Sequence, residues 1–224
     1  MILAVTGGKG GVGKSTVAYN LAARLDAVVV DADLGMADLP TARGPDLHDV
    51  LASRACPIEA VREGGPVAIL PCGRSLAGVR AADPCRLVNV LKAVEREYGR
   101  VVVDCPAGMN SDVGLALLAA RIAVLVTTPE TVALSDAIRA RALVQELDTD
   151  LVAIALNRVQ NPNDSPQEYV EEVFGTPVTP IPFSTSVQTA MAHGQPVEEH
   201  ANGDKAVSTA FARLAESVQS SMRS

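Results

Sequence analysis

Short apolar runs alternate with longer helical patterns along the chain. The apolar runs are rich in valine, isoleucine and leucine and are nearly continuous, which is typical of parallel strands covered on both faces. They span residues 2–6, 27–33, 67–71, 100–106, 122–129, 151–157 and 176–182. Helical patterns occupy residues 14–25, 84–98, 133–147 and 205–222. This alternation predicts an α/β fold, a doubly wound and mainly parallel sheet flanked by helices, with ligands at the carboxyl ends of the strands.

The length and composition predict a single domain spanning residues 1–224. The chain is 48% hydrophobic and contains no repeats, low-complexity tracts or convincing linker, so we expect one packed core. Met1 leads directly into an apolar strand, which leaves no room for a charged signal segment. No uninterrupted apolar run reaches the length of a membrane span. We therefore expect a cytoplasmic protein.

Charge and cysteine usage narrow the possible partners. The formal net charge is -7 and no basic run is present, which disfavours binding to nucleic acid or to anionic lipid. The cysteines are scattered, and no pair has the C-x-x-C spacing of a metal or redox site. They are Cys56, Cys72, Cys85 and Cys105. We interpret them as structural thiols.

A glycine-rich loop, GGKGGVGKST at residues 7–16, follows the first strand and opens a helix. The pattern Gly8-x-x-x-x-Gly13-Lys14-Ser15 matches a P-loop in its expected strand-loop-helix context. Backbone N–H groups of such a loop point at phosphate oxygens, and the helix N-terminus adds its positive dipole end. The candidate phosphate-binding residues are Gly8, Gly10, Gly11, Val12, Gly13, Lys14 and Ser15. We expect Lys14 to bridge the β- and γ-phosphates and the Ser15 hydroxyl to bind Mg²⁺.

The loop contains two of the four lysines in a chain that otherwise uses arginine. Lys9 and Lys14 therefore suggest that compact ammonium groups, rather than forked guanidinium groups, are required there.

Acidic residues follow two of the predicted strands. Asp104 ends VVVD and is interpreted as the Walker B carboxylate that holds the Mg²⁺ shell, the alternative being a turn or helix-cap residue. Asp31 and Asp33 lie two apart on an extended segment and so point to opposite faces. We expect Asp33 to orient the attacking water. The candidate metal ligands are Ser15, Asp33 and Asp104, and we place Asp31 near the hydration shell of the Mg²⁺ ion. The alternative is a solvated acidic turn, which applies also to Asp38.

The order of these motifs resembles the MinD/ParA class of P-loop ATPases, which carry a deviant Walker A motif, and the match is closest to archaeal MinD-like proteins. The resemblance runs nearly end to end. Its blocks are GGKGGVGKST, DADLGMADLP, LHDVL, ILPCGRSLAGV, VVVDCPAGM, TTPETVALSDAIRA, ALNRV and IPFSTSVQTAMAHGQPV.

The resemblance implies ATP and Mg²⁺ as cofactors and an ATP-dependent homodimer. Lys9 would act across that dimer on the partner's phosphates, as an arginine finger does elsewhere. Thr16 would contact the α-phosphate. Asn157 would bind the adenine edge beside Arg158, and the backbone after Pro182 would close the base pocket. For Asn157 the alternative is a side chain that caps a strand end.

The chain departs from the MinD pattern in two places. Asp38 stands where asparagine is usual. The C-terminus lacks the basic amphipathic helix of membrane-binding members, and its apolar stripe predicts a helix packed on the domain. The stripe consists of Val207, Phe211, Leu214, Val218 and Met222. Direct membrane binding is therefore not expected, although a partner could recruit the protein to the membrane or the cell pole.

The resemblance implies a Mg-dependent ATPase that works as a dimerising switch. It would bind an unidentified regulatory or cargo protein and so position a cellular machine, such as the division site, a motility apparatus or a chemosensory apparatus. Two alternatives stay open, a ParA-like segregation ATPase and a metabolic P-loop synthetase or metal-cluster carrier. The segregation ATPase needs a basic DNA-binding surface, which the net charge of -7 disfavours. An iron–sulfur carrier would be expected to show a paired-cysteine motif, which is absent here, and small-molecule synthetases usually lack an equivalent of Lys9.

Overall fold

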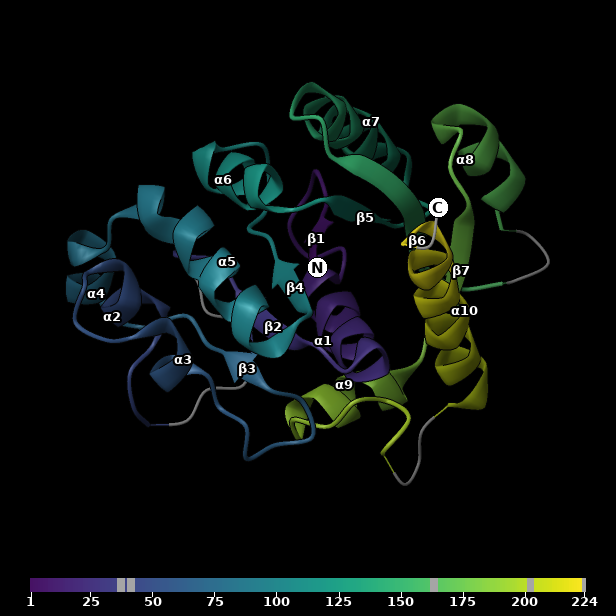
Figure 1. The fold of residues 1–224 in the computed structure, drawn as a ribbon. Helices are drawn as coiled ribbons and strands as arrows, with labels where there is room; N and C mark the ends of the chain where they lie inside the picture. The colour runs from purple at the N-terminus through teal and green to yellow at the C-terminus, as the bar shows by residue number, and fades with distance from the viewer. Residues whose placement is uncertain (36–38, 40–42, 162–164, 201–203, 223–224) are drawn as a thin grey trace.

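The computed structural model describes residues 1–35, 39, 43–161, 165–200 and 204–222, and its strands form one seven-stranded sheet (Figure 1). The strand order is β3-β2-β4-β1-β5-β6-β7, and every pairing between neighbouring strands is parallel. The bounds are β1 Ile2–Thr6, β2 Val28–Asp31, β3 Ile69–Leu70, β4 Val101–Asp104, β5 Ile122–Thr127, β6 Asp150–Val159 and β7 Val178–Pro182. The predicted fold class is confirmed.

Helices connect these strands and cover both faces of the sheet. Their bounds are α1 Lys14–Leu25, α2 Leu47–Leu51, α3 Pro57–Ala60, α4 Leu76–Ala81, α5 Leu87–Tyr98, α6 Ser111–Ala119, α7 Thr131–Glu146, α8 Gln167–Phe174, α9 Thr185–Ala192 and α10 Lys205–Ser221. The helix predicted over residues 84–98 is divided, because Asp83 caps a 3-10 turn, η1 Pro84–Arg86, that precedes α5. The other predicted helices lie within two residues of their expected bounds.

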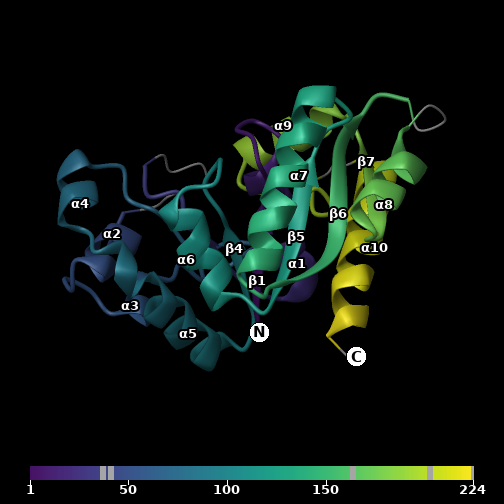
Figure 2. The same ribbon diagram turned by 90° about the horizontal axis from the view of Figure 1, so that it is seen from above.

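Successive residues of the strands point to opposite faces of the sheet and so pack in different parts of the core. On β1, Leu3 and Val5 pack with α1 and α10, whereas Ile2 and Ala4 pack with α5 and α6 on the opposite face. At the β7 end of the sheet, α7 and α8 cover one face of β6 and β7, and α10 covers the opposite face (Figure 2). Continuous apolar strands therefore reflect burial on both faces.

The strand order reverses at β1, and this positions the glycine-rich loop. From β1 the chain crosses to β2 and β3, returns to β4 beside β1, and then continues to β5 on the other side. In open α/β sheets, ligands bind outside the carboxyl ends of the strands at such a switch point. The loop after β1 and the acidic ends of β2 and β4 therefore lie at one edge.

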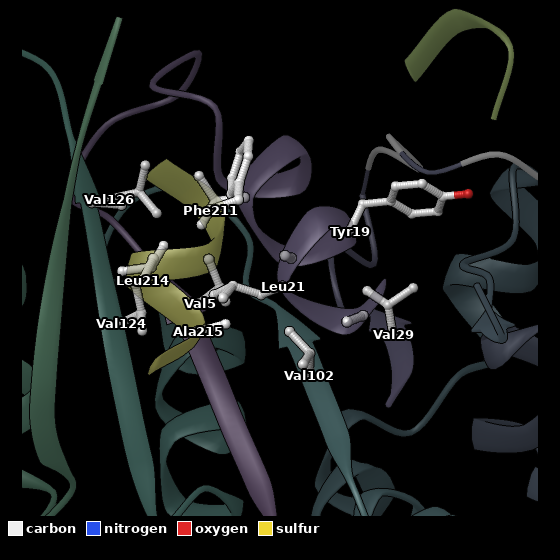
Figure 3. Packing of buried hydrophobic residues seen from close by; sticks show 14 of the residues in the cluster. Val5, Tyr19, Leu21, Val29, Val102, Val124, Val126, Phe211, Leu214 and Ala215 are labelled. Carbon is white, nitrogen blue, oxygen red and sulfur yellow. The ribbon is translucent and has the colours of Figure 1, made fainter. Parts of the chain in front are cut away.

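The last helix, α10, packs on the sheet through its predicted stripe. Phe211 and Leu214 lie beside Val124 and Val126 of β5 and are fully or almost fully buried (Figure 3). Val207 and Val218 are buried as well, so the predicted packing is confirmed for these stripe residues. Met222 follows the end of α10 and is 41% exposed, so its inclusion in the buried stripe was wrong. Within the described part of the chain, no helix combines the length and apolarity needed to span a bilayer.

We predict that Phe211→Ala lowers the free energy of unfolding by about 3–5 kcal/mol, because it empties a large volume between α10 and the sheet. Urea denaturation followed by far-UV circular dichroism measures the loss. The matched control is Leu118→Ala on α6, whose side chain is 58% exposed and should change stability by less than about 0.5 kcal/mol. Equal stabilities for the two variants would contradict the packing of α10.

Candidate functional site

The glycine-rich loop is packed tightly against two distant parts of the chain. Gly13 has a φ of 100°, and a Cβ built there would lie 2.2 Å from Asn157 Nδ2. A Cβ at Gly8 would lie 2.1 Å from the carbonyl oxygen of Asp136 on α7. Both distances are far below van der Waals contact, so only glycine fits at these motif positions. The loop is thereby fixed between α7 and the end of β6.

The first turn of α1 faces the same edge of the sheet. Gly13 is the N-cap residue and has no side chain to cap the helix. The turn carries the predicted phosphate ligands Lys14, Ser15 and Thr16. A helix N-terminus directs backbone N–H groups and positive dipole at a bound anion. This geometry fits the phosphate site predicted from the sequence.

Lys14 is buried beside the acidic end of β4. Lys14 is only 7% exposed, and its Nζ lies 3.5 Å from the carbonyl oxygen of Lys9. Burial raises the pKa of the Cys105 thiol, the Asp104 carboxylate raises it further, and the Lys14 ammonium opposes them. The thiol therefore stays neutral, as expected of a structural cysteine.

Asp31 and Asp104 are register partners at the ends of β2 and β4. Strands in a sheet lie about 4.8 Å apart and partner residues share a face, so the two carboxylates are neighbours. They are 0% and 2% exposed. Adjacent buried carboxylates repel each other unless cations compensate them.

The oxygen donors at this edge suit Mg²⁺. Asp104 and the Ser15 hydroxyl at the start of α1, two of the predicted ligands, offer hard oxygen donors beside Asp31. The assignment of Asp33 as a metal ligand stays a prediction. Mg²⁺ in nucleotide sites is usually held by one or two carboxylates or hydroxyls together with phosphate oxygens. Among the described residues, no group of three or more His, Cys, Asp or Glu side chains could hold a metal ion. Two carboxylates and a hydroxyl are the donor set with which proteins hold Mg²⁺ beside nucleotide phosphates.

Asp31 also orders the segment that follows β2. Its Oδ1 accepts a hydrogen bond from the Asp33 N–H at 3.2 Å, and its Oδ2 accepts one from the Leu39 N–H at 3.3 Å. Asp33 lies beyond the end of the strand, and its own Oδ1 accepts a bond from Gly35 N–H at 3.2 Å. The alternative of a solvated turn is wrong for Asp31, which is fully buried. Asp38 lies outside the described residues.

A cavity of about 50 Å³ brings together the residues predicted to hold the base. Its lining includes Gly13, Thr16, Asn157, Arg158 and Pro182, with apolar walls from Ile181, Val187 and Phe211. Asn157 is 8% exposed; its Nδ2 donates to the Val12 carbonyl at 2.8 Å, and its Oδ1 accepts from Arg158 N–H at 2.9 Å. An amide has a second N–H and a second lone pair, which match the donor and acceptor of an adenine edge. The role of Asn157 in base binding stays a prediction, and the capping bond to Arg158 is present as well.

Lys9 lies on the outer side of the loop, where it forms an ion pair that the sequence analysis missed. Its Nζ lies 3.6 Å from Glu130 Oε2, and the two side chains are 41% and 71% exposed. Glu130 follows the carboxyl end of β5, as Asp31 and Asp104 end their strands. Its position just after a strand was the sequence feature that could have marked Glu130 as a residue of the site. Glu130 also lines a cavity of about 420 Å³, which shares Arg158 and Phe183 with the base cavity.

Comparison with known proteins agrees with this geometry. The family profile described as the CobQ/CobB/MinD/ParA nucleotide binding domain matches residues 3–197. An ATP-binding protein of Methanocaldococcus jannaschii is 35% identical over 208 residues, which cover 87% of this chain and 79% of that protein.

Two solved structures share the whole fold. The cell division ATPase MinD of Pyrococcus furiosus superimposes with a TM-score of 0.89 and is 31% identical, with 98% of each chain covered. The septum site-determining protein MinD of Pyrococcus horikoshii, solved in complex with Mg-ADP, gives the same TM-score and identity, covering 99% of this chain and 96% of that one. The chain therefore belongs to the CobQ/CobB/MinD/ParA family of nucleotide-binding proteins and has the fold of its MinD ATPases.

Proposed function

We propose that this protein is a Mg-dependent, MinD-like ATPase that dimerises when it binds ATP and so acts as a switch that positions a cellular machine. The observation that carries this proposal is the different surroundings of the two loop lysines. Lys14 is buried in the cradle, whereas Lys9 lies at the surface with its ammonium group 3.6 Å from an exposed glutamate. One loop thus supplies one cation to its own site and presents another outward.

The pairing of Lys9 with Glu130 is weak enough to be exchanged. Ion pairs between exposed side chains contribute about 0–1 kcal/mol, because water screens the attraction and ordering two long side chains costs entropy. Phosphate oxygens of a nucleotide bound by a second subunit would attract the Lys9 ammonium more strongly, since they carry a higher charge density. We infer that Lys9 leaves Glu130 when two ATP-bound subunits meet.

Hydrolysis then depends on three groups of this chain. Lys14 compensates the charge of the β- and γ-phosphates, Lys9 compensates charge in the partner's site, and Asp33 orients the attacking water. Ser15, Asp33 and Asp104 are the residues that would hold Mg²⁺, which would supply further positive charge to the phosphates. Loss of the γ-phosphate removes the anion that Lys9 contacts, so the dimer separates and the switch resets. The Mg-ADP complex of the Pyrococcus horikoshii relative supports the choice of nucleotide and metal.

The alternatives predict a different use of the same loop. A metabolic P-loop synthetase usually lacks an equivalent of Lys9, and an iron–sulfur carrier would be expected to show a paired-cysteine motif, which this chain does not have. A ParA-like segregation ATPase would use the dimer but requires a basic surface for DNA, which a net charge of -7 disfavours. The dependence of dimerisation on Lys9 therefore distinguishes a metabolic synthetase from the proposed switch.

We predict opposite effects of Lys9→Ala and Asp33→Ala on assembly. Lys9→Ala should retain most of the ATP affinity of the monomer but lose the ATP-dependent dimer, because no cation reaches the partner's phosphates. Asp33→Ala should accumulate the dimer and lower turnover on the order of a hundredfold, because water is no longer oriented. Size-exclusion chromatography with light scattering in Mg-ATP, together with phosphate release, measures both.

Lys92→Ala on α5 is the matched control, since it removes an exposed lysine far along the chain from the loop and should behave as wild type. Normal dimerisation of Lys9→Ala, or a monomeric Asp33→Ala at saturating ATP, would rule out the switch.

We also propose that the protein is cytoplasmic and reaches the membrane or cell pole only through a regulatory or cargo protein. The apolar stripe of α10 supports this, because Val207, Phe211, Leu214 and Val218 are buried in the domain and so unavailable to lipid. We predict that anionic phospholipid vesicles sediment less than about a tenth of the protein with or without Mg-ATP. ATP-dependent co-sedimentation of the purified protein with vesicles alone would overturn this proposal.

A further inference from the structure

His48 on α2 contacts the segment that carries Asp33. The residue is 1% exposed, and its Nε2 lies 2.9 Å from the carbonyl oxygen of Leu34. A carbonyl oxygen only accepts hydrogen bonds, so Nε2 carries the hydrogen and donates it. Leu34 directly follows Asp33, the residue that we propose to orient the attacking water.

This bond completes the support of the Asp33 backbone. On the N-terminal side, the Asp33 N–H donates to Asp31 Oδ1 at 3.2 Å. On the C-terminal side, the Leu34 N–H donates to the Ala32 carbonyl at 3.0 Å, and the Leu34 carbonyl accepts from His48. The Leu34 carbonyl and the Gly35 N–H belong to one peptide group, and that N–H donates to Asp33 Oδ1 at 3.2 Å. His48 therefore holds the peptide group that binds the Asp33 carboxylate.

Two glycines pack closely against the imidazole of His48. A Cβ at Gly73 would lie 2.4 Å from His48 Nδ1, and one at Gly78 of α4 would lie 2.9 Å from the same atom. Both glycines thus pack directly on the ring. Helix α2 is itself fixed, because Asp46 and Asp49 form a reciprocal capping box at its start. A side chain held so closely is suited to hold another group in place.

The neighbouring thiol does not replace this bond. Cys72 Sγ lies 3.4 Å from His48 Nε2. Burial and the Asp31 carboxylate raise the pKa of Cys72, so the thiol stays neutral. A neutral thiol is a weak hydrogen-bonding group. Cys72 therefore offers a control inside the same buried cluster.

We propose that His48 is a positioning residue for ATP hydrolysis, acting by holding the Leu34 carbonyl and thereby the Asp33 carboxylate. The inference deepens the proposed function and rests on its assignment of Asp33. It predicts that turnover depends on a hydrogen-bond donor at the position of Nε2, and that ATP binding does not.

The matched pair His48→Gln and His48→Asn tests this, because both introduce a buried amide but differ in reach. The glutamine Nε2 can occupy the position of the imidazole Nε2, whereas the asparagine amide ends at the position of Nδ1. We expect His48→Asn to lower kcat on the order of tenfold, as for one lost hydrogen bond, with KM unchanged. His48→Gln should stay within about threefold of wild type, and the control Cys72→Ala should match wild type.

Hydrogen exchange gives a readout that is independent of hydrolysis. In the nucleotide-free protein, peptides covering residues 31–35 should exchange faster in His48→Asn than in His48→Gln, while the rest of the sheet is unchanged. Equal kcat for the asparagine and glutamine variants, or an equal loss in Cys72→Ala, would overturn the positioning role. If Asp33→Ala retains wild-type turnover, the assignment of Asp33 fails first and the role of His48 fails with it.

Discussion

The candidate nucleotide site, at the carboxyl ends of the strands, depends on the in-register pairing of β2 with β4, which buries Asp31 beside Asp104. Two adjacent carboxylates removed from water repel each other and lose hydration, so nearby cations stabilise this edge. Lys14 supplies one positive charge from the start of α1. A divalent cation bound with ATP supplies more, and so occupancy of the site and stability of the fold are linked.

The same pairing connects the metal edge to the hydrolytic geometry. Asp31 accepts backbone hydrogen bonds from the segment that carries Asp33, so a change at its carboxylate is transmitted to the residue proposed to orient water. His48 supports that segment from the other side. Lys9, by contrast, lies at the surface in a weak ion pair. The inner side of the site is held by hydrogen bonds, whereas the proposed function requires its outer cation to leave Glu130 for the partner's phosphates.

Sequence reasoning recovered the sheet because continuous apolar runs require burial on both faces, and it recovered the P-loop because its spacing demands glycine at tightly packed positions. It extended β2 to residue 33, whereas the strand ends at Asp31 because the following N–H groups turn back to its carboxylate. The neighbourhood of Asp31 and Asp104 could not be predicted, since it depends on β4 lying between β1 and β2. The contacts of Lys9 with Glu130 and of His48 with Leu34 are likewise products of tertiary packing.

Thermal unfolding in ATP, with either Mg²⁺ or EDTA, tests most directly whether the buried carboxylate pair is completed by the metal. The account predicts that the wild-type midpoint rises more with Mg-ATP than with ATP in EDTA, because the cation binds the folded state beside Asp104. In Asp104→Asn, the Mg-dependent increment should disappear, because one of the predicted ligands of the cation loses its charge. A wild-type midpoint that rises equally with and without Mg²⁺, or an Asp104→Asn variant with the full Mg-dependent increment, would contradict it.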